Sequence, residues 1–110
     1  MKEKPAKPNP AEIDYSVIDS AEITVFKAGN GKHPIGCVHL DKRTGEIFGL
    51  IVSSDYRRKG VATELLNRVE DYASNHFKLP KIWSWTTPLN TESSELFRKR
   101  NYRGGLYWEK

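Results

Sequence analysis

The chain has 110 residues and a formal net charge of +4, with 37% hydrophobic and 29% charged residues. This length allows one small domain with a modest core, and the composition suits a globular protein. No apolar run approaches the roughly 20 residues of a membrane-spanning helix, and the N-terminus lacks the apolar segment of a secretory signal. The single cysteine, Cys37, excludes an internal disulfide and offers no metal-ligand spacing, so we expect a cytoplasmic protein without a metal. The positive charge favours an anionic partner.

The first segment, "MKEKPAKPNP", is rich in proline and lysine. It cannot bury enough apolar surface to become ordered, so we expect residues 1–12 to form a mobile tail. Residues 13–110 then form a single domain.

Four β-prone segments follow the tail. The short run "DYSVIDS" comes first, and Ala21–Lys27 and Ile35–Leu40 are separated by the turn-rich loop "AGNGKHP". The sequence "DKRTG" then predicts a hairpin connection in which Gly45 adopts a positive φ angle. Glu46–Val52 is apolar on both faces after its first residue, which predicts a central strand.

The hydrophobic period changes to that of a helix after Gly60. A helical stripe runs to about Asn75, and its members are Val61, Leu65, Leu66, Val69, Tyr72 and Ala73. "KIWSWTT" predicts a strand, Thr91–Arg100 a second helix, and "LYWEK" a last strand after a glycine pair. We therefore predict the order β-β-β-β-α-β-α-β, a mixed α/β (α+β) fold in which two helices pack on a mostly antiparallel sheet.

The connection between the central strand and the first helix carries the strongest functional signal. Three consecutive cations, Arg57, Arg58 and Lys59, precede Gly60 at the predicted start of the helix. Free backbone N–H groups and the helix dipole make a helix N-terminus an anion site, and a glycine lets a ligand approach the backbone closely. Ala62 keeps the approach open and Thr63 adds a hydroxyl. These parts predict a diphosphate site, although neither GxxxxGK[ST] nor GxGxxG is present.

Arg57-x-x-Gly60-x-Ala62 has the form [Q/R]-x-x-G-x-[G/A], and it lies between an apolar strand and an amphipathic helix. This segment resembles the acetyl-CoA signature of the GCN5-related N-acetyltransferases (GNAT family). "NTESSELFRKRNY", in which Asn90 and Phe97 keep a seven-residue spacing, is similar to the element that follows the fifth strand in that family. The resemblance covers about Gly45 to Tyr102.

The resemblance implies the GNAT-like acyl-CoA N-acyltransferase fold, with central parallel strands that splay around acetyl-CoA, which is the co-substrate. The pantetheine arm is expected between the fourth and fifth strands. The diphosphate is expected on the amide groups of the helix N-terminus. The implied cofactor-binding residues are Leu50, Ile51, Val52, Arg57, Arg58, Lys59, Gly60, Val61, Ala62, Thr63, Asn90 and Phe97.

Transfer of an acetyl group to an amine needs a base for the amine and donors for the developing oxyanion. Glu46 lies eleven positions before Arg57, the offset of the base glutamate in the histone-acetylating branch of the family, and so Glu46 is the expected catalytic base. The backbone N–H of Ile51 or Val52 is the expected oxyanion donor. Phe97 occupies the place where many members carry a tyrosine acid, so that acid is absent.

Other reactive or aromatic side chains have simpler interpretations. We expect Cys37 to be a buried structural cysteine, and Trp83 and Trp85, on one face of the fifth strand, to belong to the core. His39 lies on the strand face of Cys37 and is interpreted as a half-exposed strand histidine. We expect Tyr102 to pack in the core.

The chain has no room for the two helices that family members place between their first and second strands. The acceptor side of the site should therefore be open, which favours a protein lysine or N-terminal amine over an enclosed small molecule. A small-molecule amine acetyltransferase and a non-catalytic module that binds coenzyme A or a partner stay open as alternatives. We expect neither a membrane nor nucleic acid to be the main partner, because +4 is modest and coenzyme A already accounts for the clustered cations. The protein is expected to be a monomer or homodimer.

Overall fold

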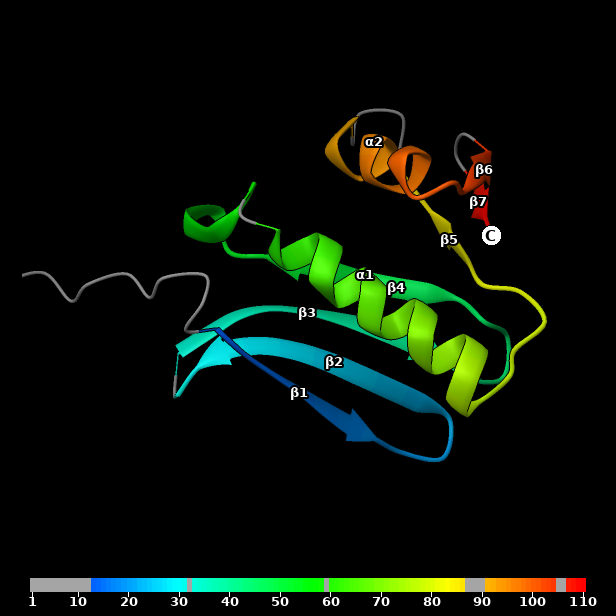
Figure 1. Cartoon of the computed structure of the whole chain (residues 1–110), viewed down its shortest axis with the longest axis horizontal. Coiled ribbons are helices and arrows are strands. Elements are labelled where there is room, and N and C mark those ends of the chain that lie inside the picture. Colours follow the sequence, from blue (N-terminus) through cyan, green and yellow to red (C-terminus); the bar gives the residue numbers. More distant parts are fainter. Residues whose placement is uncertain (1–12, 32, 59, 87–90, 105–106) are drawn as a thin grey trace, which may run out of the picture.

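The computed structural model describes residues 13–31, 33–58, 60–86, 91–104 and 107–110. The predicted tail at residues 1–12 lies outside this part of the chain, as do Lys59 and Asn90. The elements, drawn in Figure 1, are β1 (Asp14–Asp19), β2 (Ile23–Asn30), β3 (His33–Asp41), β4 (Ile47–Val52), the 3-10 turn η2 (Ser54–Tyr56), α1 (Val61–Asp71), the π turn η3 (Tyr72–His76), β5 (Trp83–Trp85), α2 (Thr91–Lys99), β6 (Arg103–Gly104) and β7 (Tyr107–Glu109).

The strands form two sheets rather than one continuous sheet. The first sheet has the antiparallel order β1-β2-β3-β4, and the second has the order β5-β7-β6. They meet at one parallel bridge between Glu46 and Trp83. The predicted order of strands and helices is confirmed, whereas the short strand β6 was not predicted.

Several local predictions are confirmed and others are corrected. Gly45 adopts the predicted positive φ angle, 82°. Asn101, which follows α2, has a φ angle of 67°, the left-handed conformation that often ends a helix. The loop "AGNGKHP" is much shorter than predicted, because β2 continues to Asn30 and β3 begins at His33. Gly29 pairs with β1 and β3, and Asn30 pairs with β3, and this pairing outweighs the weak intrinsic strand preference of the two residues.

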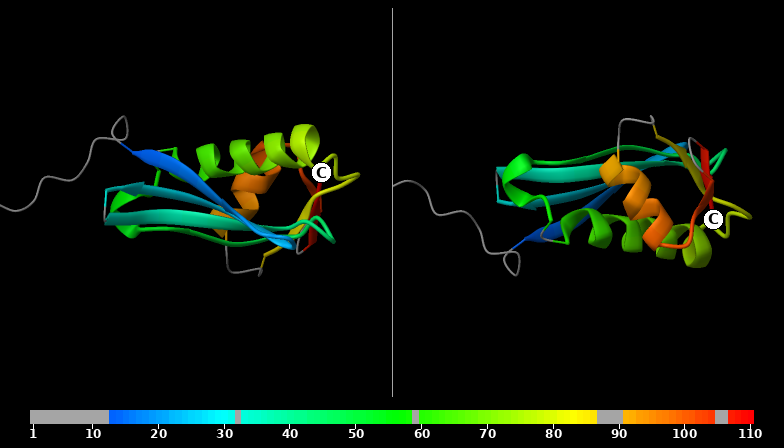
Figure 2. Two further views of the ribbon diagram at one scale, coloured as in Figure 1. Left: turned by 90° about the horizontal axis from the view of Figure 1, so that it is seen from below. Right: turned by 90° about the horizontal axis from the view of Figure 1, so that it is seen from above.

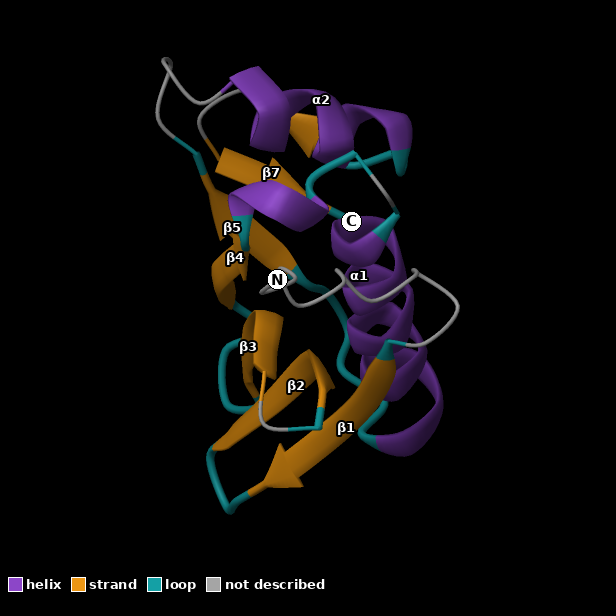
Figure 3. Ribbon diagram, turned by 90° about the vertical axis from the view of Figure 1, so that its left-hand side faces the viewer, coloured by secondary structure: helices purple, strands orange, loops and turns teal. Residues whose placement is uncertain are grey.

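The core lies between the first sheet and α1. The predicted stripe of α1 is buried at Val61, Leu65, Leu66 and Val69, and Ala73 extends it, so the helical period was a reliable guide. Figure 3 shows α1 along one side of the strands, and Figure 2 shows α2 beside α1 at the end where β5 and β7 lie. Among the described residues, no helix is long and apolar enough to cross a membrane.

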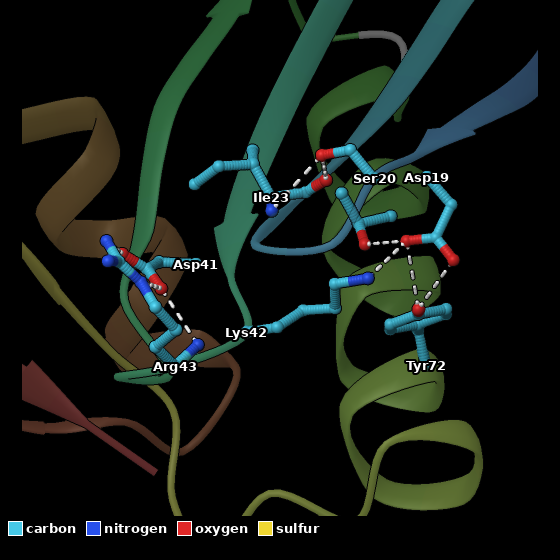
Figure 4. A network of polar contacts seen from close by, with 8 residues as sticks. Asp19, Ser20, Ile23, Asp41, Lys42, Arg43 and Tyr72 are labelled. Carbon is cyan, nitrogen blue, oxygen red and sulfur yellow. Dashed lines mark hydrogen bonds and ion pairs between the residues drawn. The ribbon is translucent and has the colours of Figure 1, made fainter.

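A polar network closes the end of the sheet where β1 turns into β2. The Asp19 carboxylate accepts hydrogen bonds from Lys42 Nζ and Thr24 Oγ1, both at 2.6 Å, and from the Tyr72 hydroxyl at 3.2 Å (Figure 4). The hydrogen bond from Lys42 is the largest cause of a lowered Asp19 pKa. The network therefore joins the first two strands, the turn before β4 and the end of the helix.

A second polar cluster holds α2 and the C-terminal strand against α1. Glu70 on α1 accepts hydrogen bonds from Arg100 Nη2 at 2.6 Å and from the Tyr102 hydroxyl at 2.9 Å, and Lys110 Nζ lies 3.3 Å away. Burial by itself raises the pKa of Glu70, but the hydrogen bonds from Arg100 and Tyr102 and the nearby positive charges outweigh it and leave that pKa below its usual range. The ionised carboxylate therefore stabilises the fold.

We expect Glu70→Gln to lower the free energy of unfolding at pH 7 by about 2 kcal/mol, because Arg100 loses its charged partner in a partly buried site. A lowered folded-state pKa contributes stability above the unfolded value of about 4.3, and this stability disappears as pH falls through the folded pKa. The difference between wild type and variant in urea unfolding should thus shrink between pH 5 and pH 3.

Glu64→Gln is the matched control, because Glu64 pairs with Arg68 on the exposed side of the same helix. It should change stability by less than about 0.5 kcal/mol. Equal effects of the two substitutions, or an effect of Glu70→Gln that stays constant with pH, would contradict this assignment.

Candidate functional site

The connection from β4 to α1 presents free backbone donors. Gly60 is the N-cap residue of α1, with φ 82° and no side-chain cap, and its carbonyl accepts the first helical bond from the Glu64 N–H at 2.9 Å. The N–H groups of Val61, Ala62 and Thr63 therefore have no partner within the helix. Tyr56, which is 2% exposed, anchors the connection in the core. The result is a fixed helix N-terminus with three donors pointing outward.

The space in front of this helix end is open. A Cβ atom placed on Gly60 would meet no other atom within 4 Å. The side chains of Arg57 and Arg58 are exposed next to it, and Arg58 itself adopts φ 60°. Backbone donors, a helix dipole and two guanidinium groups around an open approach match the chemistry of a diphosphate. The residues present therefore fit the phosphates of coenzyme A.

A β-bulge interrupts the pairing of β3 with β4. Cys37 pairs with Ile51 and His39 pairs with Phe48, so one residue of β3 faces two residues of β4, Gly49 and Leu50. Gly49 has φ 63°, and a Cβ atom there would lie 2.6 Å from His39 Nδ1, so only glycine fits. An isolated glycine in an apolar strand is a sequence signal for a bulge, and Gly49 is such a glycine.

In the described part of the chain, β4 and β5 are joined near the beginning of each strand. Besides the bridge from Glu46 to Trp83, the Trp83 N–H donates to the Gly45 carbonyl at 3.1 Å and Ser84 Oγ donates to the Ile47 carbonyl at 2.8 Å. Beyond these contacts, the ladders among the described residues join β4 to β3 and β5 to β7. This is the geometry of splayed strands.

The end of β4 turns one backbone edge toward the splay. The Ser53 N–H donates to the Ile35 carbonyl at 2.8 Å, whereas the Val52 carbonyl accepts a hydrogen bond from Arg57 Nε at 3.2 Å. Because the N–H and C=O of one residue in an antiparallel strand point to the same side, the Val52 N–H faces away from β3. Ile51 and Val52 are the two expected oxyanion donors, and the backbone N–H of Val52 has the better orientation for this role.

The remaining predicted cofactor residues differ in exposure. Leu50, Val52 and Ala62 are partly buried, Thr63 is exposed, and Ile51 is 63% exposed. The side chain of Val61 is buried, so this residue can offer only its backbone N–H to a ligand.

Phe97 is 2% exposed, and its ring packs against Tyr102 and Trp108 with centroid distances of 4.9 and 6.2 Å. Tyr102 is buried as predicted, and burial strongly raises the pKa of its hydroxyl.

Glu46 lies where the two sheets meet. It is partly buried, its N–H donates to Thr44 Oγ1 at 3.2 Å, and it is opposite Trp83 in the bridge. Because Ile47 faces the helix side and is buried, Glu46 and Phe48 lie on the opposite face of the sheet. The expected base is thus on the face that no helix covers in the described part of the chain (Figure 3).

The prediction that Trp83 and Trp85 belong to the core is wrong. Trp83 is partly buried and Trp85 is 60% exposed, whereas Ser84 between them is buried opposite Trp108. The helix side of β5 is already filled by Trp108 and α2, so a small residue fits there and the large rings face outward. The sequences Trp-Ser-Trp and Tyr-Trp-Glu of the two paired strands alternate between the two faces of the sheet. The alternation alone does not say which of the two faces is buried.

Cys37 also differs from its prediction. It is only partly buried, and its Sγ lies 3.7 Å from the Gly49 carbonyl. His39, on the same face, is half-exposed as predicted and stacks on Phe48 at 4.9 Å. Among the described residues no group of His, Cys, Asp and Glu side chains could hold a metal ion.

The sequence matches the Acetyltransferase (GNAT) family over residues 2–102, and the chain belongs to this family. No curated protein sequence matches it. Solved structures that share the fold include a GNAT family acetyltransferase from Elizabethkingia anophelis with acetyl-CoA bound. Its TM-score is 0.71 and its sequence identity is 18%, and the match covers 84% of this chain and 76% of that one.

Two further structures have the same fold. NAA60 of Arabidopsis thaliana, in complex with a bisubstrate analogue, has a TM-score of 0.67, 18% identity, and coverage of 83% of this chain and 74% of that one. Spermidine N-acetyltransferase from Vibrio cholerae has a TM-score of 0.63, 21% identity, and coverage of 82% and 63%. The chain spans 65% of AAC(6')-Iy, slightly less than two thirds of its length.

We expect Gly60→Ala to weaken acetyl-CoA binding about tenfold, which corresponds to about 1.4 kcal/mol. The added methyl group fills the open approach to the helix N-terminus. The left-handed φ angle should also cost the unliganded protein about 1 kcal/mol. Thermal unfolding with and without acetyl-CoA separates the two effects, because a ligand that binds the folded state raises the melting temperature.

Gly31→Ala is the matched control. Gly31 has φ 57° and open space around it, but it lies in the β2–β3 hairpin. This variant should have a similar intrinsic cost and a normal acetyl-CoA shift. If both variants lost the acetyl-CoA-dependent rise in melting temperature, the phosphates would not bind at the α1 N-terminus.

Proposed function

We propose that this protein is an acetyl-CoA-dependent N-acetyltransferase that moves an acetyl group to an amine. The observation that carries the proposal is the open, donor-rich N-terminus of α1 at Gly60, flanked by Arg57 and Arg58, next to the end of β4 where this strand leaves β5. Membership in the GNAT family supports it.

The two ends of the splay supply different interactions in this proposal. The N–H groups of the first turn of α1 and the two arginines bind the phosphates of the co-substrate. The exposed backbone edge of Leu50 to Val52 lies along its pantetheine arm. Since β4 has no hydrogen-bonded neighbour on that side beyond Ile47 among the residues that the structure describes, the arm can pair with the strand as a substitute strand.

Glu46 is the proposed general base. Its carboxylate takes a proton from the acceptor ammonium group, directly or through a water, and the neutral amine then attacks the thioester carbonyl. A C–N bond forms, the Val52 N–H donates to the developing oxyanion, and the C–S bond breaks as coenzyme A leaves. Glu46 is suited to this role because it lies on the open face at the point where β4 and β5 meet.

The leaving group needs no side-chain acid in this scheme. Phe97 has no proton to donate, and the hydroxyl of the neighbouring Tyr102 is hydrogen-bonded to Glu70. A thiol has a pKa of about 8.5, so a thiolate is a tolerable leaving group at neutral pH and solvent can protonate it afterwards.

The proposed acceptor is an amine on another protein. No described helix covers the face that carries Glu46, Phe48 and Ile51, and Phe48 and Ile51 are 36% and 63% exposed. A small metabolite is normally enclosed by its site, whereas an open face can receive a side chain or chain end that projects from a larger molecule. This openness favours a protein lysine or N-terminal amine.

Glu46→Gln should leave the thermal shift with acetyl-CoA unchanged and lower kcat at pH 7 by about 10²- to 10⁴-fold, the usual contribution of a general base. The measurement is release of the coenzyme A thiol during acetylation of a lysine-bearing peptide, with mass spectrometry of the product. Raising the pH toward the pKa of the amine should recover part of the rate, because the amine then loses its proton without help.

Glu22→Gln is the control, since Glu22 lies exposed in the turn between β1 and β2. An unchanged rate in Glu46→Gln would remove Glu46 from the base role. Acetyl-CoA binding without transfer in the wild type to any amine tested would instead favour a non-catalytic module.

A further inference from the structure

Three aromatic rings form a corner on the open face of the second sheet. Trp83 and Tyr107 are stacked at 25° with centroids 5.3 Å apart. The ring of Trp85 stands at 82° to Trp83 and 74° to Tyr107, with centroids 6.2 and 5.3 Å away. Trp85 is the most exposed of the three. Two ring orientations, nearly at right angles, thus border one patch of surface, here called the aromatic corner.

The aromatic corner is held in place by its neighbours. Trp83 Nε1 donates to the Thr44 carbonyl at 3.0 Å, and Trp85 pairs with Tyr107 across the β5–β7 ladder. The Tyr107 hydroxyl donates to Glu109 at 2.9 Å, and Lys81 lies 2.9 Å from the same carboxylate. The rings are therefore preorganised, and the negative charge of Glu109 is already balanced by Lys81.

A second carboxylate borders the aromatic corner without such compensation. Glu46 is opposite Trp83 in the bridge between the sheets and lies on the same face, since residues opposite each other in parallel strands point the same way. Within the described ranges the Glu46 carboxylate has no ion-pair partner. π-faces beside an uncompensated carboxylate are the chemistry that binds an organic ammonium ion.

We propose that the aromatic corner of Trp83, Trp85 and Tyr107 is the acceptor subsite, which receives the alkylammonium side chain of a lysine before Glu46 removes its proton. This inference rests on the proposed function. The acceptor amine is a cation at neutral pH, and the negative faces of the rings attract it together with the Glu46 charge. Trp85 lies two residues beyond the bridge, where β5 separates from β4. The subsite therefore lies between solvent and the end of β4.

The first test is kinetic and uses Nα-acetyl-lysine methylamide as the acceptor. Trp85→Leu keeps an apolar side chain but removes the π-face, so KM for this acceptor should rise about two- to thirtyfold. The kcat should change little, because the lost contact is made before the chemical step. Phe77→Leu is the matched control, because Phe77 is 45% exposed and lies after η3, outside the aromatic corner. Its KM should equal that of the wild type.

The second test needs no turnover. Butylammonium, titrated in the absence of acetyl-CoA, should change the tryptophan fluorescence of the wild type and of Phe77→Leu, and the change should be weaker in Trp85→Leu. 1-Butanol, which has a similar shape and no charge, should bind more weakly than butylammonium. Equal binding of the two probes would make the aromatic corner an ordinary apolar patch and overturn the proposal.

The two tests also separate this inference from the function on which it rests. Butylammonium binding that depends on Trp85, in a protein whose melting temperature acetyl-CoA does not change, would contradict the transferase assignment alone. A normal acetyl-CoA shift and normal KM in Trp85→Leu would contradict the aromatic corner alone.

Discussion

The bulge at Gly49 is the constraint on which the proposed site depends. A strand that hydrogen-bonded to both neighbours along its whole length would leave no backbone edge for another molecule. Here β3 offers one residue where β4 has two, and β4 consequently bends and twists after its first residues. Contact with β5 ends after Glu46 and Ile47. After the bulge, β4 continues into the connection to α1, so the strand edge and the helix N-terminus follow each other closely along the chain.

Charge is distributed differently on the two sides of the fold. On the helix side, Glu70 gathers Arg100, Tyr102 and Lys110 in a partly buried cluster that holds α2 on α1. At the α1 N-terminus the exposed arginines precede Gly60, which has open space around it, and a diphosphate bound there would balance their charge. Partly buried ion pairs stabilise the fold, whereas exposed charges beside an open helix end are available for a ligand.

The face of the sheets that no described helix covers carries exposed apolar side chains. Phe48, Ile51 and Trp85 are exposed on it, while the helix side of the same strands is well buried. Exposed apolar and aromatic groups next to a candidate base are more useful for binding than for stability. No described helix covers this face, and this openness is the feature on which the proposed protein acceptor rests.

Local patterns in the sequence were sufficient for the succession of strands and helices, the buried stripe of α1, and the start of α1 at Gly60. These features follow from hydrophobic periodicity and turn chemistry between neighbours in the chain. The folded chain was required for four further features: the outward direction of Trp83 and Trp85, the bulge opposite Val38, the bridge from Glu46 to β5, and the pairing of Glu70 with Arg100. Each of these depends on which face of a strand is covered, or on residues distant in sequence, and a period of two residues is equally consistent with either face of a strand until its neighbours occupy one of them.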